Sequence, residues 1–129
     1  MTIYIVNPNS SQHVTDGIER AVDPMRAASP VPIVARTLAE GPPGIETQAH
    51  VDGVVDPMLA HSAALEDQAS AFVVACFSDP GLAALREQSE RPVLGIAEAA
   101  VLTAMTLGQR FGIISILRRS IPRHMRYLG

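Results

Sequence analysis

The chain has 129 residues, of which 47% are apolar and 18% are charged, with a formal net charge of −3. This length suits one domain with a buried core, and the composition excludes intrinsic disorder and fibrous repeats. No apolar run approaches the ~18 residues that cross a bilayer, and Met1-Thr2-Ile3-Tyr4 is no targeting segment, so we expect a cytoplasmic protein without a membrane contact.

Several chemistries are excluded by residue type. All ten basic residues are arginine, which excludes Schiff bases and the phosphate-binding lysine of a P-loop. The single cysteine, Cys76, excludes an internal disulfide, and the four histidines lack zinc-site spacing, so we expect no metal. The mildly acidic chain predicts no nucleic-acid binding. Its arginine-rich end is interpreted as a solvated or partner-facing helix, with these residues: Arg110, Arg118, Arg119, Arg123 and Arg126.

The first third of the chain predicts a strand, a helix and a second strand. Residues 2–7 are a β-rich apolar run that ends in the turn cluster Asn7-Pro8-Asn9-Ser10-Ser11. A helix follows to about Ala28, a second strand covers 31–37, and a loop rich in glycine and proline covers 40–44.

The remainder continues the alternation. Asp79 and Pro80 are expected at the N-cap and first position of one helix. The predicted elements are a helix over 46–68 split at Pro57, a strand over 71–76, a helix from Pro80 to about Gln88, a strand over 92–96, a helix over 97–107, a strand over 111–117 and a terminal helix.

This alternation predicts an α/β fold: a parallel flavodoxin-like sheet of order 2-1-3-4 with helices on both faces. In that order the carboxyl ends of strands 1 and 3 are neighbours, and a ligand crevice opens between them. The crevice would be lined by loops 7–11 and 76–79. The only thiol of the chain is therefore expected at the crevice.

Cys76 has two interpretations. A free cysteine in an apolar strand is commonly a small buried hydrophobe, but a helix starting near Pro80 would present amides that favour the thiolate. No histidine is predicted beside it, which favours a thiolate that abstracts a proton from carbon. The neutral donors expected to hold a carbonyl or carboxylate and to stabilise an enolate are Asn7, Asn9, Ser10 and Ser78. Glu98 is either a site residue or a dipole partner of its helix.

Read together, four stretches and a fifth near the end resemble the Asp/Glu/hydantoin racemase superfamily, and are most similar to hydantoin and allantoin racemases. The stretches are Val6-Asn7-Pro8-Asn9-Ser10, Gly41-Pro42-Pro43-Gly44-Ile45-Glu46, Ala75-Cys76-Phe77-Ser78-Asp79-Pro80-Gly81, Pro92-Val93-Leu94-Gly95-Ile96-Ala97-Glu98-Ala99 and Gly108-Gln109-Arg110-Phe111-Gly112-Ile113-Ile114-Ser115. The resemblance implies a cofactor-independent racemase of a small substrate, a 5-substituted hydantoin or allantoin. Cys76 would be one of two acid/base cysteines, and Phe77 and Ile45 would join the substrate-binding residues.

The resemblance also implies two lobes. Residues 1–108 would form the first lobe and 109–129 the opening strand and helix of a second, so we expect a chain shortened before the partner cysteine. Two alternatives stay open: a one-cysteine decarboxylase or isomerase of the same superfamily, and a non-catalytic binding lobe. The uncovered apolar residues after 109 predict a homo-oligomer.

Overall fold

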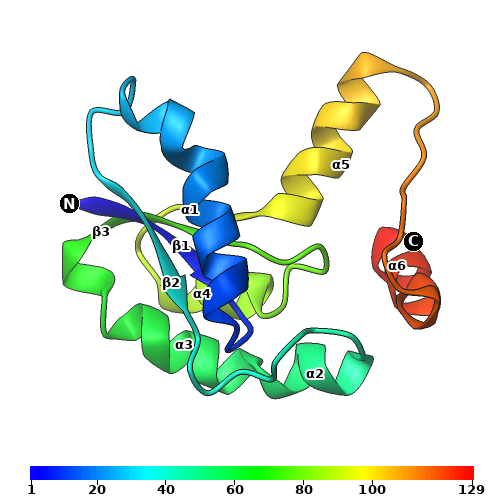
Figure 1. The fold of residues 1–129 in the computed structure, drawn as a ribbon, viewed down its shortest axis with the longest axis horizontal. Helices are drawn as coiled ribbons and strands as arrows, with labels where there is room; N and C mark the ends of the chain where they lie inside the picture. The colour runs from blue at the N-terminus through cyan, green and yellow to red at the C-terminus, as the bar shows by residue number, and fades with distance from the viewer.

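A computed structural model describes residues 1–129, in which four strands alternate with helices (Figure 1). The elements are β1 Thr2–Asn7, α1 Gln12–Arg26, β2 Ile33–Thr37, α2 Gln48–Gly53, α3 Val55–Ala63, β3 Ala69–Val74, α4 Leu82–Gln88, β4 Val93–Gly95, α5 Ile96–Leu107 and α6 Ile121–Leu128. Two short 3-10 helices, η1 Glu66–Gln68 and η2 Arg118–Ser120, precede β3 and α6.

The sheet confirms the predicted order. All neighbouring strands pair in parallel, in the order β2-β1-β3-β4. Tyr4 of β1 lies opposite Val34 of β2 on one side and Phe72 of β3 on the other. The carboxyl ends of β1 and β3 are therefore adjacent, and the loops that follow them meet at one edge of the sheet.

The core lies between one face of the sheet and helices α3 and α4. Alternate residues of each strand face the same side, so Tyr4, Val6, Phe72 and Val74 form one apolar surface. The helices cover it with Val54, Met58, Leu82 and Leu85, all in the same buried cluster. Burial of this surface is the main favourable term for the fold.

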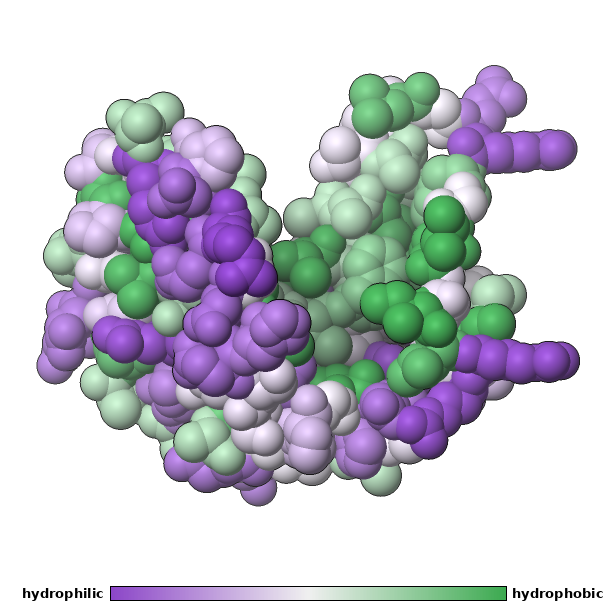
Figure 2. Space-filling view, viewed as in Figure 1, coloured by the Kyte–Doolittle hydropathy of each residue, from purple (hydrophilic) through white to green (hydrophobic).

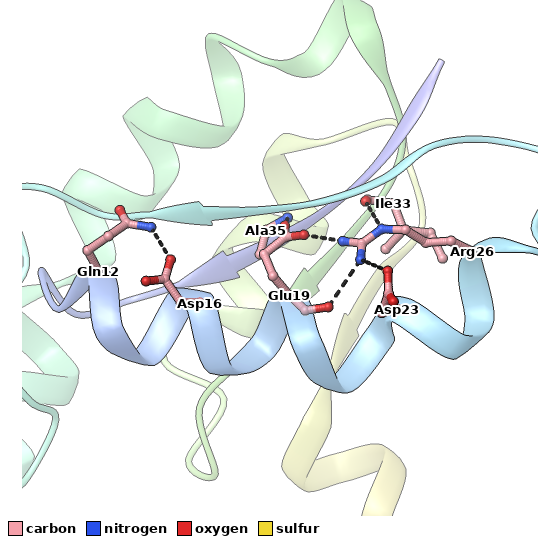
Figure 3. Close-up of polar contacts among 7 residues, drawn as sticks. All are labelled: Gln12, Asp16, Glu19, Asp23, Arg26, Ile33 and Ala35. Atoms are coloured by element: carbon pink, nitrogen blue, oxygen red, sulfur yellow. Dashed lines mark hydrogen bonds and ion pairs between the residues drawn. The ribbon is translucent and has the colours of Figure 1, made fainter.

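Helix α1 packs on the opposite face, against β2, and polar side chains fix it there (Figure 3). Arg26 at its end donates from Nε to the Ile33 carbonyl at 3.2 Å and pairs with both Asp23 and Glu19. The other oxygen of Glu19 accepts from the Ala35 amide. Helices thus lie on both faces of the sheet, as the sequence predicts.

The helical stretch after residue 46 divides three residues earlier than predicted. The break is at Val54, between Gly53 at the end of α2 and Val55 at the start of α3. Pro57 lies in the first turn of α3, where its missing N–H removes no helical hydrogen bond. Val54 is only 2% exposed, so the break places its side chain in the core.

The strand expected over 111–117 does not form, and this prediction is wrong. Residues 109–117 form no helix or strand and bend at Gln109 and Ile116, and no backbone hydrogen bond outside the regular elements involves 109–116. An apolar segment becomes a strand only when a neighbouring strand pairs its N–H and C=O groups, and this chain places none beside it.

Helix α5 and the segment that follows it, residues 96–117, form an arm that projects from the body of the molecule (Figure 1). Large apolar side chains on the arm are exposed, among them Leu107, Ile114 and Ile116. No helix in the chain has both the length and the apolar character that a membrane span requires.

Candidate active site

Cys76 lies at the carboxyl edge of the sheet, two residues beyond the end of β3. The Ala75 amide still donates to the Val6 carbonyl of β1 at 2.9 Å, and the chain then turns, with the Asp79 amide donating to the Cys76 carbonyl at 3.0 Å. The sulfur lies 3.3 Å from the Ser78 hydroxyl oxygen. The predicted position of Cys76 at the carboxyl edge of the sheet is confirmed, although β3 ends at Val74 rather than at the cysteine.

The thiol opens into a cavity of about 630 Å³ between the body and the arm. Its walls are mainly apolar, and Figure 2 shows hydrophobic residues around the hollow beside the arm, in contrast to the hydrophilic surface over α1. The lining residues are Gly44, Ile45, Glu46, Cys76, Phe77, Ala100, Val101, Ala104, Phe111–Leu117, Ser120, Arg123 and His124. An apolar pocket with a few polar groups is typical of a small-molecule site.

The pKa of the thiol shifts in the direction opposite to the sequence expectation. Burial raises the pKa of Cys76, and the hydrogen bonds from Ser78 and the charge of Arg123 offset this only in part. The prediction of a thiolate favoured by a helix N-terminus is therefore wrong. Helix α4 begins only at Leu82, after Gly81 turns the chain with a φ of 71°, and none of its amides supports the sulfur.

Asp79 caps a helix, but not the predicted one. Its oxygens accept from the Ala97 amide at 3.0 Å and the Glu98 amide at 2.7 Å, so the carboxylate caps α5 rather than α4. Asp79 itself has a φ of 44°, which turns its side chain away from the helix that follows it in sequence. A Cβ at Gly95 would overlap this carboxylate, so the approach requires glycine there.

The remaining predicted site residues separate into two groups. Ile45 and Phe77 line the cavity with Cys76, whereas Ser78 contacts the sulfur and lines a smaller neighbouring cavity. Asn7, which is fully buried, does not line the cavity, and neither do Asn9 and Ser10.

Those two residues serve the loop after β1. The Asn9 side-chain oxygen accepts from the Ser11 amide at 3.0 Å, and the Ser10 amide donates to the Pro42 carbonyl at 2.9 Å. Glu98 is also outside the cavity, because its carboxylate makes a bidentate ion pair with Arg86 at 2.8 and 3.0 Å. Of the two interpretations of Glu98, the structure favours a helix-end residue.

Sequence reasoning missed Arg123 and His124 of α6, which bring a cation and an imidazole to the cavity. The signal was present, because Ser120, Arg123, His124 and Tyr127 recur at helical spacing and share one face. The Phe77 and His124 rings meet edge to face, with 5.8 Å between their centroids. Burial and the charge of Arg123 lower the pKa of His124, which favours the neutral imidazole.

No group of three His, Cys, Asp or Glu side chains is arranged to hold a metal ion. The cavity instead offers a thiol, an imidazole, a guanidinium and the backbone amide of Phe77, which donates to no backbone acceptor. These groups can transfer a proton and stabilise negative charge on oxygen.

The family model described as Asp/Glu/Hydantoin racemase matches residues 3–129. The hydantoin racemase of Rhizobium meliloti is 41% identical over 124 residues, a match that covers 95% of this chain and 51% of that protein. The hydantoin racemase of Pseudomonas sp. (strain NS671) is 38% identical over 123 residues, a match that covers 92% of this chain and 48% of that protein.

Solved structures agree with this assignment. The allantoin racemase from Klebsiella pneumoniae superposes with a TM-score of 0.87 at 35% identity, over 98% of this chain and 54% of that one. A variant of arylmalonate decarboxylase, at 20% identity and a TM-score of 0.70, shares the fold. The chain spans about half the length of the curated relatives it matches.

Proposed function

We propose, from the premise that this chain belongs to the Asp/Glu/hydantoin racemase family, that its cavity is a substrate site where Cys76 transfers a proton at a chiral carbon. The substrate we propose is a 5-substituted hydantoin or allantoin, the classes named for its relatives. The observation that carries the proposal is the position of the only thiol, at the carboxyl edge of β3 and open to an apolar cavity.

The proposed step breaks the C–H bond beside a carbonyl and forms an S–H bond at Cys76. The electron pair left on carbon moves to the carbonyl oxygen and gives a planar enolate. The Phe77 amide, which donates to no backbone acceptor, belongs to the lining of the same cavity and would stabilise that oxygen. No group outside the chain enters this step.

The raised pKa of Cys76 has two consequences for this step. A thiolate of higher pKa is a stronger base, which helps to remove a weakly acidic C–H proton, but a smaller fraction of the thiol is ionised at neutral pH. Arg123 and Ser78 partly restore that fraction. His124, neutral in the same cavity, is a group that would accept the thiol proton.

Exchange of the proton at the chiral carbon and inversion of the configuration there need different groups. A single base removes and returns the proton on one face of the enolate, whereas inversion needs an acid on the opposite face. We propose that residues 1–108 supply the face that carries Cys76 and that 109–129 begin a second lobe. The site of this chain should then exchange the proton while the configuration is retained.

The test is exchange of the C5 proton of 5-benzylhydantoin and of allantoin in D2O, followed by NMR, with polarimetry on the same samples. Cys76→Ala and Cys76→Ser should lower the protein-dependent rate about 10²-fold or more, the usual contribution of a positioned base. His13→Gln, an exposed histidine on α1, is the matched control and should leave the rate unchanged.

Equal exchange by wild type and both Cys76 variants would refute the proposal. Release of CO2 from an arylmalonate without hydantoin exchange would assign the site to the one-cysteine decarboxylase alternative instead. Inversion at the full exchange rate by this chain would show that a second acid acts on the opposite face.

A further inference from the structure

Arg123 is a buried cation without a counter-charge. It is 6% exposed, its Nε and Nη1 atoms are fully buried, and neither has a hydrogen-bond partner. No ion pair of the chain includes it. A charged side chain is almost never fully buried unless it is paired, because removing it from water is costly.

The neighbouring acids are already engaged. Glu46 lines the same cavity but pairs with Arg119, and the Asp79 carboxylate holds the α5 amides and the Tyr127 hydroxyl. The other groups facing this region, Cys76 and His124, carry no fixed negative charge. The chain therefore supplies no anion to Arg123.

The position of Arg123 indicates where an anion would bind. Arg123 lines both the cavity beside Cys76 and the smaller cavity formed with Ser78 and Tyr127, so it stands between them. The planar guanidinium presents paired N–H donors whose spacing matches the two oxygens of a carboxylate. A carboxylate on a ligand in the larger cavity, which Arg123 lines, would pair with the guanidinium and neutralise its charge.

We propose that Arg123 binds a carboxylate of the ligand that occupies the cavity beside Cys76. This inference rests on the proposed function only in taking that cavity as the substrate site, and it narrows the substrate class. The preferred substrates carry an acidic substituent, such as a hydantoin with an acetate group at C5, rather than an apolar one.

The test uses the single thiol as a reporter. Iodoacetate and iodoacetamide alkylate Cys76 by the same displacement, in which an S–C bond forms, the C–I bond breaks and iodide leaves. They differ in that iodoacetate carries a carboxylate. The ratio of their rates, followed by intact mass, cancels changes in thiol ionisation and reports carboxylate binding beside the sulfur.

Arg123→Gln should lower the iodoacetate-to-iodoacetamide ratio about tenfold, the usual scale of a charge-assisted contact. Arg123→Lys keeps the positive charge but lacks the paired N–H donors of the guanidinium, so it should give an intermediate ratio. Arg118→Gln is the matched control, because it removes an exposed arginine outside the cavity, and its ratio should stay within about twofold of wild type.

A second measurement needs no variant. In the wild-type chain, hydantoin-5-acetate should protect Cys76 from iodoacetamide at lower concentration than the neutral amide of the same compound. An unchanged ratio in Arg123→Gln, or equal protection by the two compounds, would overturn the inference. Proton exchange lost in Cys76→Ala would still support the proposed function in that case, so the two failures are distinguishable.

Discussion

The Asp79 carboxylate joins three parts of the molecule, and its removal gives a sharp test of the structure. The side chain is carried by the loop after Cys76, caps α5 through the Ala97 and Glu98 amides, and accepts from the Tyr127 hydroxyl of α6 at 2.6 Å. The residue is 4% exposed. We predict that Asp79→Ala destabilises the chain strongly and loosens the walls of the cavity.

The magnitude follows from the contacts. A hydrogen bond to a charged group contributes about 1.5–3 kcal/mol and a lost N-cap costs about 0.5–2 kcal/mol, and the two are not additive because they share atoms. Alanine also tolerates the positive φ of Asp79 poorly, at about 1 kcal/mol. We expect about 3–5 kcal/mol for Asp79→Ala and about 1–3 kcal/mol for Asp79→Asn, since asparagine keeps one accepting oxygen and tolerates this backbone conformation.

The assay is urea unfolding followed by far-ultraviolet circular dichroism, with Asp67→Ala as the control at an exposed carboxylate, whose unfolding midpoint should not move. Tyr127→Phe should cost less in the Asp79→Asn background than in wild type, because the two residues share one hydrogen bond. A change below about 0.5 kcal/mol for Asp79→Asn, or equal costs of Tyr127→Phe in both backgrounds, would refute the reasoning.

The same contact predicts a pH dependence. Burial, and then the hydrogen bond to Asp79, raise the pKa of Tyr127 above its ordinary value. A raised pKa in the folded state means that the neutral phenol is the stabilised form. Its contribution is therefore complete below about pH 10, the pKa of an unfolded tyrosine, and is lost progressively as the pH rises above it. Tyr127→Phe should lack this alkaline loss, which urea unfolding at pH 8 and pH 11 measures.

Three further predictions concern the thiol, the α5 cap and the arm. The iodoacetamide alkylation rate of Cys76 should reach its midpoint at a higher pH than that of free cysteine, because burial raises its pKa, and a lower midpoint would contradict the site geometry. Gly95→Ala should cost about 2–4 kcal/mol in urea unfolding, because its Cβ displaces the Asp79 carboxylate, and the cost should shrink in an Asp79→Gly background. The chain should self-associate through the arm, where Ile114 is 99% and Ile116 96% exposed, and lysine at both positions should shift light scattering toward monomer.

Part of this protein follows from local sequence patterns. Apolar runs such as residues 2–7 alternate with helical stretches, and that alternation predicts a parallel sheet. With a chain too short for a barrel, it also favours the observed strand order and the edge where Cys76 lies. These features are readable because strand and helix periods, turn residues and crossover handedness act over a few residues or obey general rules.

Other features needed the tertiary structure. Which helix Asp79 caps, the side on which Arg123 and His124 face Cys76, and the direction of the thiol pKa all depend on segments far apart in the chain. The absence of the strand predicted over 111–117 also depends on the tertiary structure. The apolar pattern of this segment is typical of a strand, but the segment forms a strand only if a neighbouring strand pairs with it. Capping, burial and strand pairing each need a partner, and the partner's position is set by how the whole chain packs rather than by the residues beside it.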